Sequence, residues 1–194
     1  NHFSGKRFMA ETEILKKKKK KTYILYASEF NNAEVGETLA SDDNLVLGRS
    51  MEVSLAQITN DPKTQNIKVK FKVKEVKENK GYLELFKYFM IPTYIRRVVK
   101  PAKEKIEDSF SMVTKDNIKV VIKPILLTKS ITQSSVLSNL RKKTRDFFNE
   151  YFKKNDYNKF LQDLITHSLQ RDLKGMLNKV YPLSVCEIRV FEKL

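Results

Sequence analysis

Residues 67–76 read Ile-Lys-Val-Lys-Phe-Lys-Val-Lys-Glu-Val, in which apolar and lysine side chains alternate strictly from Ile67 to Lys74. A period of two is the pattern of a β-strand that buries one face. The apolar residues of the segment are therefore predicted to face a core, and the lysines to face outward. The outward face carries a row that we call the lysine ladder: Lys68, Lys70, Lys72 and Lys74.

The lysine ladder has two physical interpretations. Alternate residues of a strand lie about 6.6 Å apart, so the four ammonium groups form a row about 20 Å long. Neighbouring pairs repel each other by about 0.6 kcal/mol in water, which is too little to unfold a packed strand. The row can guard an edge strand against mispairing, or it can bind a polyanion. Taken alone, the strand favours the guarded edge.

The chain as a whole is strongly basic. Its 194 residues carry a formal net charge of +15, and 41% of them are hydrophobic, which is enough for a folded core. Residues 1–22 contribute +6 of this charge, so +9 remains for the rest of the chain. A field of this sign attracts nucleic acid or an anionic membrane surface.

Motifs for catalysis, cofactors or membrane insertion are not found in the sequence. Cys186 is predicted to be a small core residue, and His167, at a predicted helix break, to be a cap or surface residue. There is no Gly-rich phosphate loop, no metal-ligand spacing and no apolar run close to the ~20 residues of a membrane span. We therefore expect no enzymatic activity, cofactor, metal, membrane partner or small-molecule substrate.

Turn signals divide the first two thirds of the chain into short strands. Asn79-Lys80-Gly81 is the strongest hairpin signal, and residues 31–44 are predicted to be a polar loop. Gly48 suggests a bulge, and Pro124 is expected to bend its strand or to place it at an edge. Strands at this spacing predict an antiparallel sheet that closes into a small barrel-like domain. The predicted strands are 22–27, 45–55, 67–77, 82–89, 109–114 and 118–127.

From Gln133 onward the apolar residues recur with a period of 3.6, which predicts helices. Ser134 or Ser135 caps the first helix, Asp156 caps the second, and a third follows a break near 166–168. The predicted fold is α+β, with a disordered basic arm at 1–22, a mainly β domain at 23–128, a helical segment at 129–182 packed beside it, and a closing strand at 183–194 that returns to the sheet.

Basic side chains recur on several predicted elements besides the ladder. They come from six consecutive lysines in the arm, a short helix at 93–100, the first long helix and the closing strand. Lysine outnumbers arginine heavily, which favours phosphate neutralisation over base readout. Together these faces favour a polyanion partner. The candidate RNA-binding residues are Lys16, Lys17, Lys18, Lys19, Lys20, Lys21, Arg49, Lys68, Lys70, Lys72, Lys74, Arg96, Arg97, Lys100, Arg141, Lys142, Lys143, Arg145 and Arg189.

The order of several short motifs resembles one protein family. It is the S-three-Ae, or e-S-one, family of small-subunit ribosomal proteins from archaea and eukaryotes, and the resemblance covers about residues 23–194. No single motif is specific, but their order and spacing together are. The motifs are Gly36-Glu37-Thr38, Asp42-Asp43, Leu47-Gly48-Arg49, Glu52-Val53-Ser54-Leu55, Lys68 to Val73, Tyr94-Ile95-Arg96-Arg97, Thr114-Lys115-Asp116, Gln133-Ser134-Ser135, Tyr181-Pro182-Leu183 and Glu187-Ile188-Arg189.

This resemblance implies a structural protein of the small-subunit platform, near the mRNA exit and the 3′ end of the rRNA. It implies a barrel-like sheet with helices beside it, and no catalytic activity. The implied partners are small-subunit rRNA, neighbouring ribosomal proteins, and mRNA and initiation factors near the exit. The implied location is the cytoplasmic ribosome, with nucleolar assembly.

The sequence departs from the family pattern in two places, where Ser130-Ile131-Thr132 replaces a basic pair and Asn117 replaces a hairpin glycine. One alternative function is a free basic nuclear or chromatin protein drawn to nucleic acid by charge alone. Co-migration with small ribosomal subunits distinguishes the ribosomal protein from this one. An RNA-modifying enzyme is a third option, and it would need a cofactor pocket that no motif locates.

Overall fold

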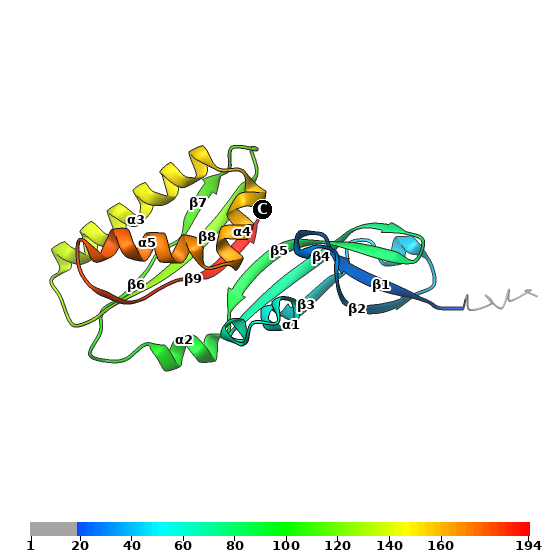
Figure 1. Ribbon diagram of the computed structural model, residues 1–194, viewed down its shortest axis with the longest axis horizontal. Coiled ribbons are helices and arrows are strands. Elements are labelled where there is room, and N and C mark those ends of the chain that lie inside the picture. Colours follow the sequence, from blue (N-terminus) through cyan, green and yellow to red (C-terminus); the bar gives the residue numbers. More distant parts are fainter. Residues whose placement is uncertain (1–18) are drawn as a thin grey trace, which may run out of the picture.

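The computed structural model describes residues 19–194 as an α+β fold, and over this range nine strands form one sheet accompanied by five α-helices (Figure 1). In chain order the elements are β1 (Lys21–Ala27), β2 (Ala33–Ala40), β3 (Ser50–Ser54), α1 (Leu55–Thr59), β4 (Ile67–Lys77), β5 (Lys80–Met90), α2 (Pro92–Val98), β6 (Lys105–Glu107), β7 (Phe110–Val113), β8 (Lys119–Thr128), α3 (Ser134–Lys154), α4 (Tyr157–Ile165), α5 (Ser168–Asn178) and β9 (Leu183–Lys193).

The alternating segment forms β4, and its predicted faces are confirmed. Its apolar side chains are buried, with Phe71 and Val69 both fully inaccessible, whereas Lys72 and Lys74 are exposed. However, β4 pairs with β5 on one side and with β3 on the other. The guarded-edge interpretation is therefore wrong, because the ladder projects from a face of the sheet and does not lie along an open edge.

The hairpin between β4 and β5 is confirmed, although its turn lies one residue earlier than predicted. Glu78 and Asn79 occupy the turn with φ values of 49° and 62°, and Lys77 pairs with Lys80. Two register shifts follow, and they offset one another. As a result, Lys70 lies directly opposite Lys87, as the turn alone would place it.

The sheet branches around the long strand β5. Strand order is β2-β1-β5-β9-β8-β6, with β4 also on β5, β3 on β4 and β7 on β8. We call β1–β5 the N-terminal lobe, and β6–β9 with α3–α5 the C-terminal lobe. Only the last part of β5, Lys87–Phe89, pairs with β9, so this short ladder connects the two lobes.

The predicted closure into a barrel is wrong, because the sheet stays open. Strands β2 and β3 lie at free edges of the N-terminal lobe, and β1 pairs with β5 in parallel, so the sheet is not wholly antiparallel. The side chain of Met51 in β3 reaches the backbone of β2, where a Cβ on Gly36 would lie 3.1 Å from the Met51 Cε.

Two local predictions in this lobe also need correction. The segment expected as a polar loop contains β2, whose side chains alternate poorly and bury only Ala40. The strand expected to start at residue 45 starts at Ser50. Gly48 lies before that strand with φ 77°, and its N–H donates to the Val73 carbonyl at 3.0 Å.

In the C-terminal lobe, β8 is an interior strand and not the edge that Pro124 suggested. It pairs with β9 on one side and with β7 and β6 in succession on the other. Pro124 lies between the segments that pair with β7 and β6, at a register shift, so its missing N–H removes no regular ladder bond. Strand β6 had no signal in the sequence.

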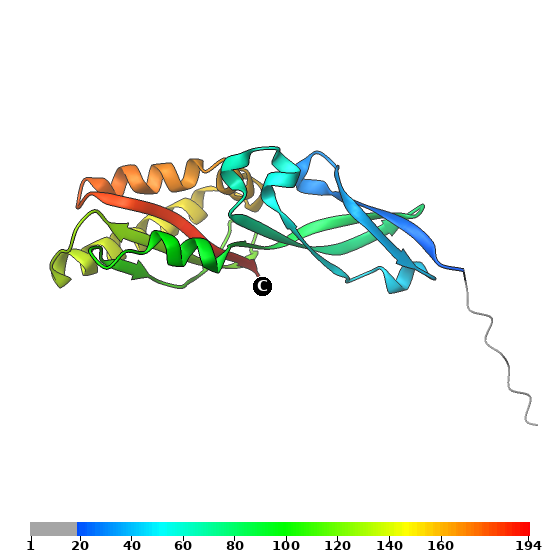
Figure 2. The ribbon, with the colours of Figure 1, turned by 90° about the horizontal axis from the view of Figure 1, so that it is seen from below.

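Helices α3, α4 and α5 cover one face of the C-terminal lobe (Figures 1 and 2). An aromatic cluster fills the space between them and the sheet, with the ring of Phe160 5.0 Å from the rings of both Phe152 and Phe191. Helix α2 lies against the other face, where Tyr94 and Ile95 border a small cavity shared with β8 and β9. That second face carries the candidate site.

A partly buried carboxylate links the turn after β1 to β5. The Glu29 Oε1 accepts the Leu85 N–H at 2.9 Å, while its Oε2 is buried without a hydrogen-bond partner. Burial raises the pKa of Glu29 despite that hydrogen bond. Because the folded pKa is raised, the contribution of Glu29 to stability is complete below its ordinary pKa and is lost as the pH rises through the folded value.

We therefore expect Glu29→Gln to remove this loss of stability at higher pH. Glutamine keeps a carbonyl acceptor for the Leu85 N–H, and any cost of burying its amide is independent of pH. Thermal melts of both proteins between pH 4 and pH 8 provide the measurement. The melting temperature of the variant should rise relative to that of the wild type as the pH increases. A difference in melting temperature that stays constant with pH would contradict the prediction.

Candidate nucleic-acid interface

The lysine ladder is only partly free to bind an external anion. Lys68 Nζ lies 2.8 Å from Glu52 Oε1, and Lys74 Nζ lies 3.6 Å from a Glu84 carboxylate oxygen. Within residues 19–194, Lys70 and Lys72 form no ion pair. Glu52 and Glu84 lie opposite Lys70 and Lys72 on the neighbouring strands but form their ion pairs with other lysines, so the middle of the ladder is its least paired part.

Glu84 also links the two lobes. Burial disfavours its charged form, but hydrogen bonds and attraction from Lys193 and Lys74 outweigh burial and hold the pKa of Glu84 below its usual value. Lys193 also lies over the ring of Tyr157, 5.0 Å from its centroid. Glu84 thus ties the end of β9 to β5 and reduces the charge at one end of the ladder.

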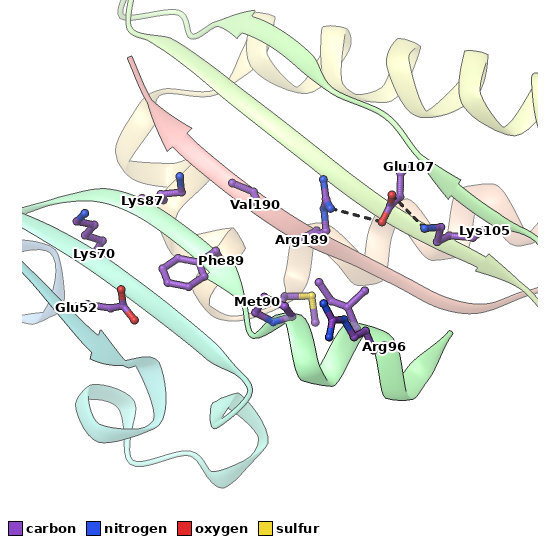
Figure 3. Close-up of a pocket in the computed structure, with 12 residues that line it drawn as sticks. Glu52, Lys70, Lys87, Phe89, Met90, Arg96, Lys105, Glu107, Arg189 and Val190 are labelled. Carbon is purple, nitrogen blue, oxygen red and sulfur yellow. Dashed lines mark ion pairs between the residues drawn. The ribbon is translucent and has the colours of Figure 1, made fainter. Parts of the chain in front are cut away.

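An open groove of about 570 Å³ lies where the ladder face meets the C-terminal lobe (Figure 3). Strands β3, β4 and β5 form one side of it, and α2, β6 and β9 form the other. Five cationic and two carboxylate side chains line this groove, which we call the junction groove: Lys70, Lys87, Arg96, Lys105, Arg189, Glu52 and Glu107.

The carboxylates of the junction groove already have cationic partners. Glu107 lies 3.3 Å from Lys105 and 3.7 Å from Arg189, and Glu52 forms an ion pair with Lys68. Arg96 has no ion pair within the described residues, and the Arg189 Nε is buried without a hydrogen-bond partner. The groove therefore has a net positive charge and unused donors.

Between these charges the groove has an apolar floor. Phe89 of β5 lies directly opposite Val190 of β9, and Met90 of β5 with Pro92 and Ile95 of α2 completes the apolar lining. Lys87, two residues before Phe89, pairs with Glu192 at 3.1 Å. Cations thus lie on both sides of a strip that contains one aromatic ring.

Two cations and the one aromatic ring of this groove were missed by sequence reasoning. They are Lys87, Lys105 and Phe89. The hairpin turn could have identified Lys87, since it places Lys87 opposite Lys70. Lys105 and Phe89 join the site only because β6, β9 and β5 meet there, and that meeting has no local signal.

Arg49 has a structural role within its own lobe. Its guanidinium donates to the Leu45 carbonyl at 2.7 Å, to the Leu39 carbonyl at 3.0 Å and to the Thr38 hydroxyl at 2.6 Å. These bonds hold the turn before β3 against the end of β2. The Nε and Nη1 donors of Arg49 are thus engaged within the protein, so this side chain has a structural role whether or not its Nη2 also meets RNA.

The basic residues in and just after α2 differ in how far they already contact other groups of the protein. Arg97 lies over the ring of Tyr94, 5.6 Å from its centroid, and approaches Asn66 at 3.5 Å. Lys100 is exposed just beyond the helix. Only Arg96 of this set lines the junction groove.

The basic cluster of α3 lies apart from the ladder. Lys142 and Lys143 are exposed, Arg141 pairs with Asp108 at 3.8 Å, and Arg145 lies 5.5 Å from the ring centroid of Phe110. Because α3 covers the face opposite α2, the fold does not bring this cluster to the junction groove (Figure 2).

The start of β1, which carries Lys21, lies at the end of the N-terminal lobe that points away from the C-terminal lobe (Figure 1). Lys16, Lys17 and Lys18 lie outside the described residues. Lys19 and Lys20 are exposed, and Lys21 is the first residue of β1, so the strand begins inside the segment predicted as an arm.

The described part of the chain contains no group of three or more His, Cys, Asp or Glu residues placed to hold a metal ion. Burial raises the pKa of the Cys186 thiol to about 12. His167 precedes α5 with φ 57°, and its Nδ1 lies 3.7 Å from Glu187. None of the helices in residues 19–194 is long and apolar enough to cross a membrane.

Comparison with known proteins gives a consistent result. The model of the ribosomal S3Ae family matches residues 12–194. The chain is similar to the small ribosomal subunit protein eS1 of Nanoarchaeum equitans, with 33% identity over 84% of this chain and 82% of that protein. It is also similar to eS1 of Archaeoglobus fulgidus, with 31% identity over 90% of this chain and 84% of that protein. With eS1 of Halorubrum lacusprofundi it shares 27% identity over 93% of this chain and 85% of that protein.

Proposed function

The chain belongs to the ribosomal S3Ae family and is a structural, non-enzymatic component of the small ribosomal subunit, and from this premise we propose that it binds rRNA phosphates through its ladder face. One observation carries the proposal. The ladder projects from an interior strand, and Lys70 and Lys72 at its centre form no ion pair within residues 19–194, although Glu52 and Glu84 lie opposite them on the neighbouring strands and pair with other lysines. Phosphate contacts of this kind position a protein on RNA without reading its sequence.

The proposed position of the protein within the small subunit is based on its family membership. We propose a place on the platform near the mRNA exit, beside neighbouring ribosomal proteins and within reach of mRNA and initiation factors. The exposed cluster of α3 and the lysines at 16–21 supply further contacts to rRNA or to these proteins. The proposed location is the ribosome in the cytoplasm. In a cell that has a nucleolus, the protein would be assembled into the subunit there.

Lys70→Gln combined with Lys72→Gln is expected to weaken the salt resistance of the protein in small subunits. Each lost phosphate contact lowers the slope of log affinity against log salt by about 0.7–0.9, so the pair should lower it by about 1.4–1.8. Sucrose-gradient sedimentation of small subunits at increasing salt measures the release of the protein. The double variant should leave the subunit at lower salt than the wild type.

Matched controls separate this effect from loss of charge alone. Lys153→Gln with Lys154→Gln removes the same charge from the exposed end of α3. Lys68→Gln with Lys74→Gln removes ladder charges that already pair with Glu52 and Glu84. The proposal is wrong if the Lys70→Gln, Lys72→Gln protein leaves the small subunit at no lower salt concentration than the two control proteins. A wild-type protein found only free or on DNA would support the nuclear alternative.

A further inference from the structure

We propose that the junction groove holds one unpaired RNA nucleotide, with its base on the apolar floor and its phosphates on the surrounding cations. The inference rests on the proposed rRNA contact and names the part of the RNA that this groove accepts. A groove of about 570 Å³ is within the size range of small-ligand sites. A base inside a duplex cannot enter such a groove, whereas an unstacked base can.

The floor supplies a surface on which a base can stack. Phe89 is only partly buried, and its neighbour across the β5–β9 ladder is the small apolar Val190. Single-stranded RNA is recognised by stacking of bases on aromatic rings and on guanidinium planes. Arg96 and Arg189 offer such planes at the groove wall (Figure 3). The sheet and α2 therefore place a ring and two guanidinium groups around one cavity.

The cations are placed for phosphates on either side of that base. Lys70 and Lys87 face each other across β4 and β5, and Arg96 approaches from α2 on the other side. Lys87 shares its charge with Glu192, but Lys70 and Arg96 have no ion pair within the described residues. A strand that crosses the groove would thus meet a cation before and after its inserted base.

The aromatic ring of the groove distinguishes RNA from an acidic peptide. A segment rich in Asp and Glu can pair with the cations but has no base to stack on Phe89, whereas a nucleotide has both phosphates and a base. Glu52 and Glu107 already pair with Lys68, Lys105 and Arg189, and their remaining acceptor sites can accept hydrogen bonds from the exocyclic amino group of a base, as Glu does from cytosine. The combination of acceptors, a ring and cations favours a nucleotide over a purely anionic protein segment.

The test uses the full chain and a fluorescein-labelled eight-nucleotide single-stranded RNA, with the same strand in a duplex as comparison. Fluorescence anisotropy at several salt concentrations measures both affinities. Phe89→Ala is expected to weaken single-strand binding about tenfold, the effect of losing one stacked base, and to leave duplex binding unchanged. Arg96→Lys keeps the charge but removes the plane, so it should also reduce single-strand binding selectively.

Phe89→Leu serves as a second variant in case the alanine variant does not fold, because it keeps apolar volume and removes the ring. Equal binding of single strand and duplex by the wild type, or equal loss of both in the variants, overturns the inference. So does Phe89-dependent binding of an eight-residue Asp- and Glu-rich peptide without RNA binding. Each of these results leaves the proposed rRNA contact standing, because the Lys70 and Lys72 gradient experiment decides that separately.

Discussion

Phe191→Ala is expected to lower the free energy of unfolding by about 3–5 kcal/mol, the usual cost of removing a buried aromatic ring from a core. Phe191 is fully inaccessible, its ring lies 5.0 Å from that of Phe160 and 6.2 Å from that of Tyr157, and its backbone pairs opposite Tyr88 and Ile122. The residue thus contacts α4 while its strand connects the two lobes. Its removal leaves a cavity that none of these elements can close alone.

Chemical denaturation measures this loss. Phe191→Leu keeps most of the volume and should cost less than about 1.5 kcal/mol. Val113→Ala, at a side chain that is 51% exposed, should remain within about 0.5 kcal/mol of the wild type. If the alanine variant unfolds at the same denaturant concentration as Val113→Ala, the connection through β9 contributes little to stability.

Arg49→Ala is expected to lower the free energy of unfolding by about 1–2 kcal/mol and to leave RNA affinity unchanged. The side chain donates to Leu45, Leu39 and Thr38, and each net hydrogen bond contributes about 0.5–1.5 kcal/mol. The site is exposed, so water replaces part of what is lost, and the total remains at the lower end of the sum. The protein should lose order first between the end of β2 and the start of β3.

Two measurements distinguish this structural role from the RNA contact suggested by the sequence. Hydrogen exchange of residues 43–49 should become faster in Arg49→Ala and in Arg49→Lys, because lysine keeps the charge but lacks the planar fork of donors. The salt dependence of binding to small subunits should stay the same. A slope lower by about 0.7–0.9 would instead show that Arg49 contacts a phosphate.

Much of the secondary structure could be predicted because it depends on local pattern. The faces of β4, the hairpins at Asn79 and Asn117, and the helices after Gln133 all follow from periodicity or turn chemistry, and each is observed. Strand β2 was missed because it buries only Ala40 and so carries little alternation. Strand β6 has three residues, too few for a periodic signal.

The candidate site was predictable only in part. The unpaired Lys70 and Lys72 were among the predicted residues, but so was Arg49, whose donors bind its own backbone. Whether a cation is free depends on the acids that the fold places beside it, and Glu84 reaches Lys193 across the boundary between the lobes. Such pairs join residues far apart in the chain, so no local pattern reveals them.

The sequence by itself determined the α+β class, the outward direction of the lysine ladder and the excess of positive charge, because composition and a period of two need no tertiary partner. Only the tertiary structure decided that β4 is an interior strand, that the sheet stays open, and that β5, α2, β6 and β9 enclose one groove. These features depend on residues as distant in the chain as Glu52 and Val190 lining one groove, which happens only when the two lobes are joined.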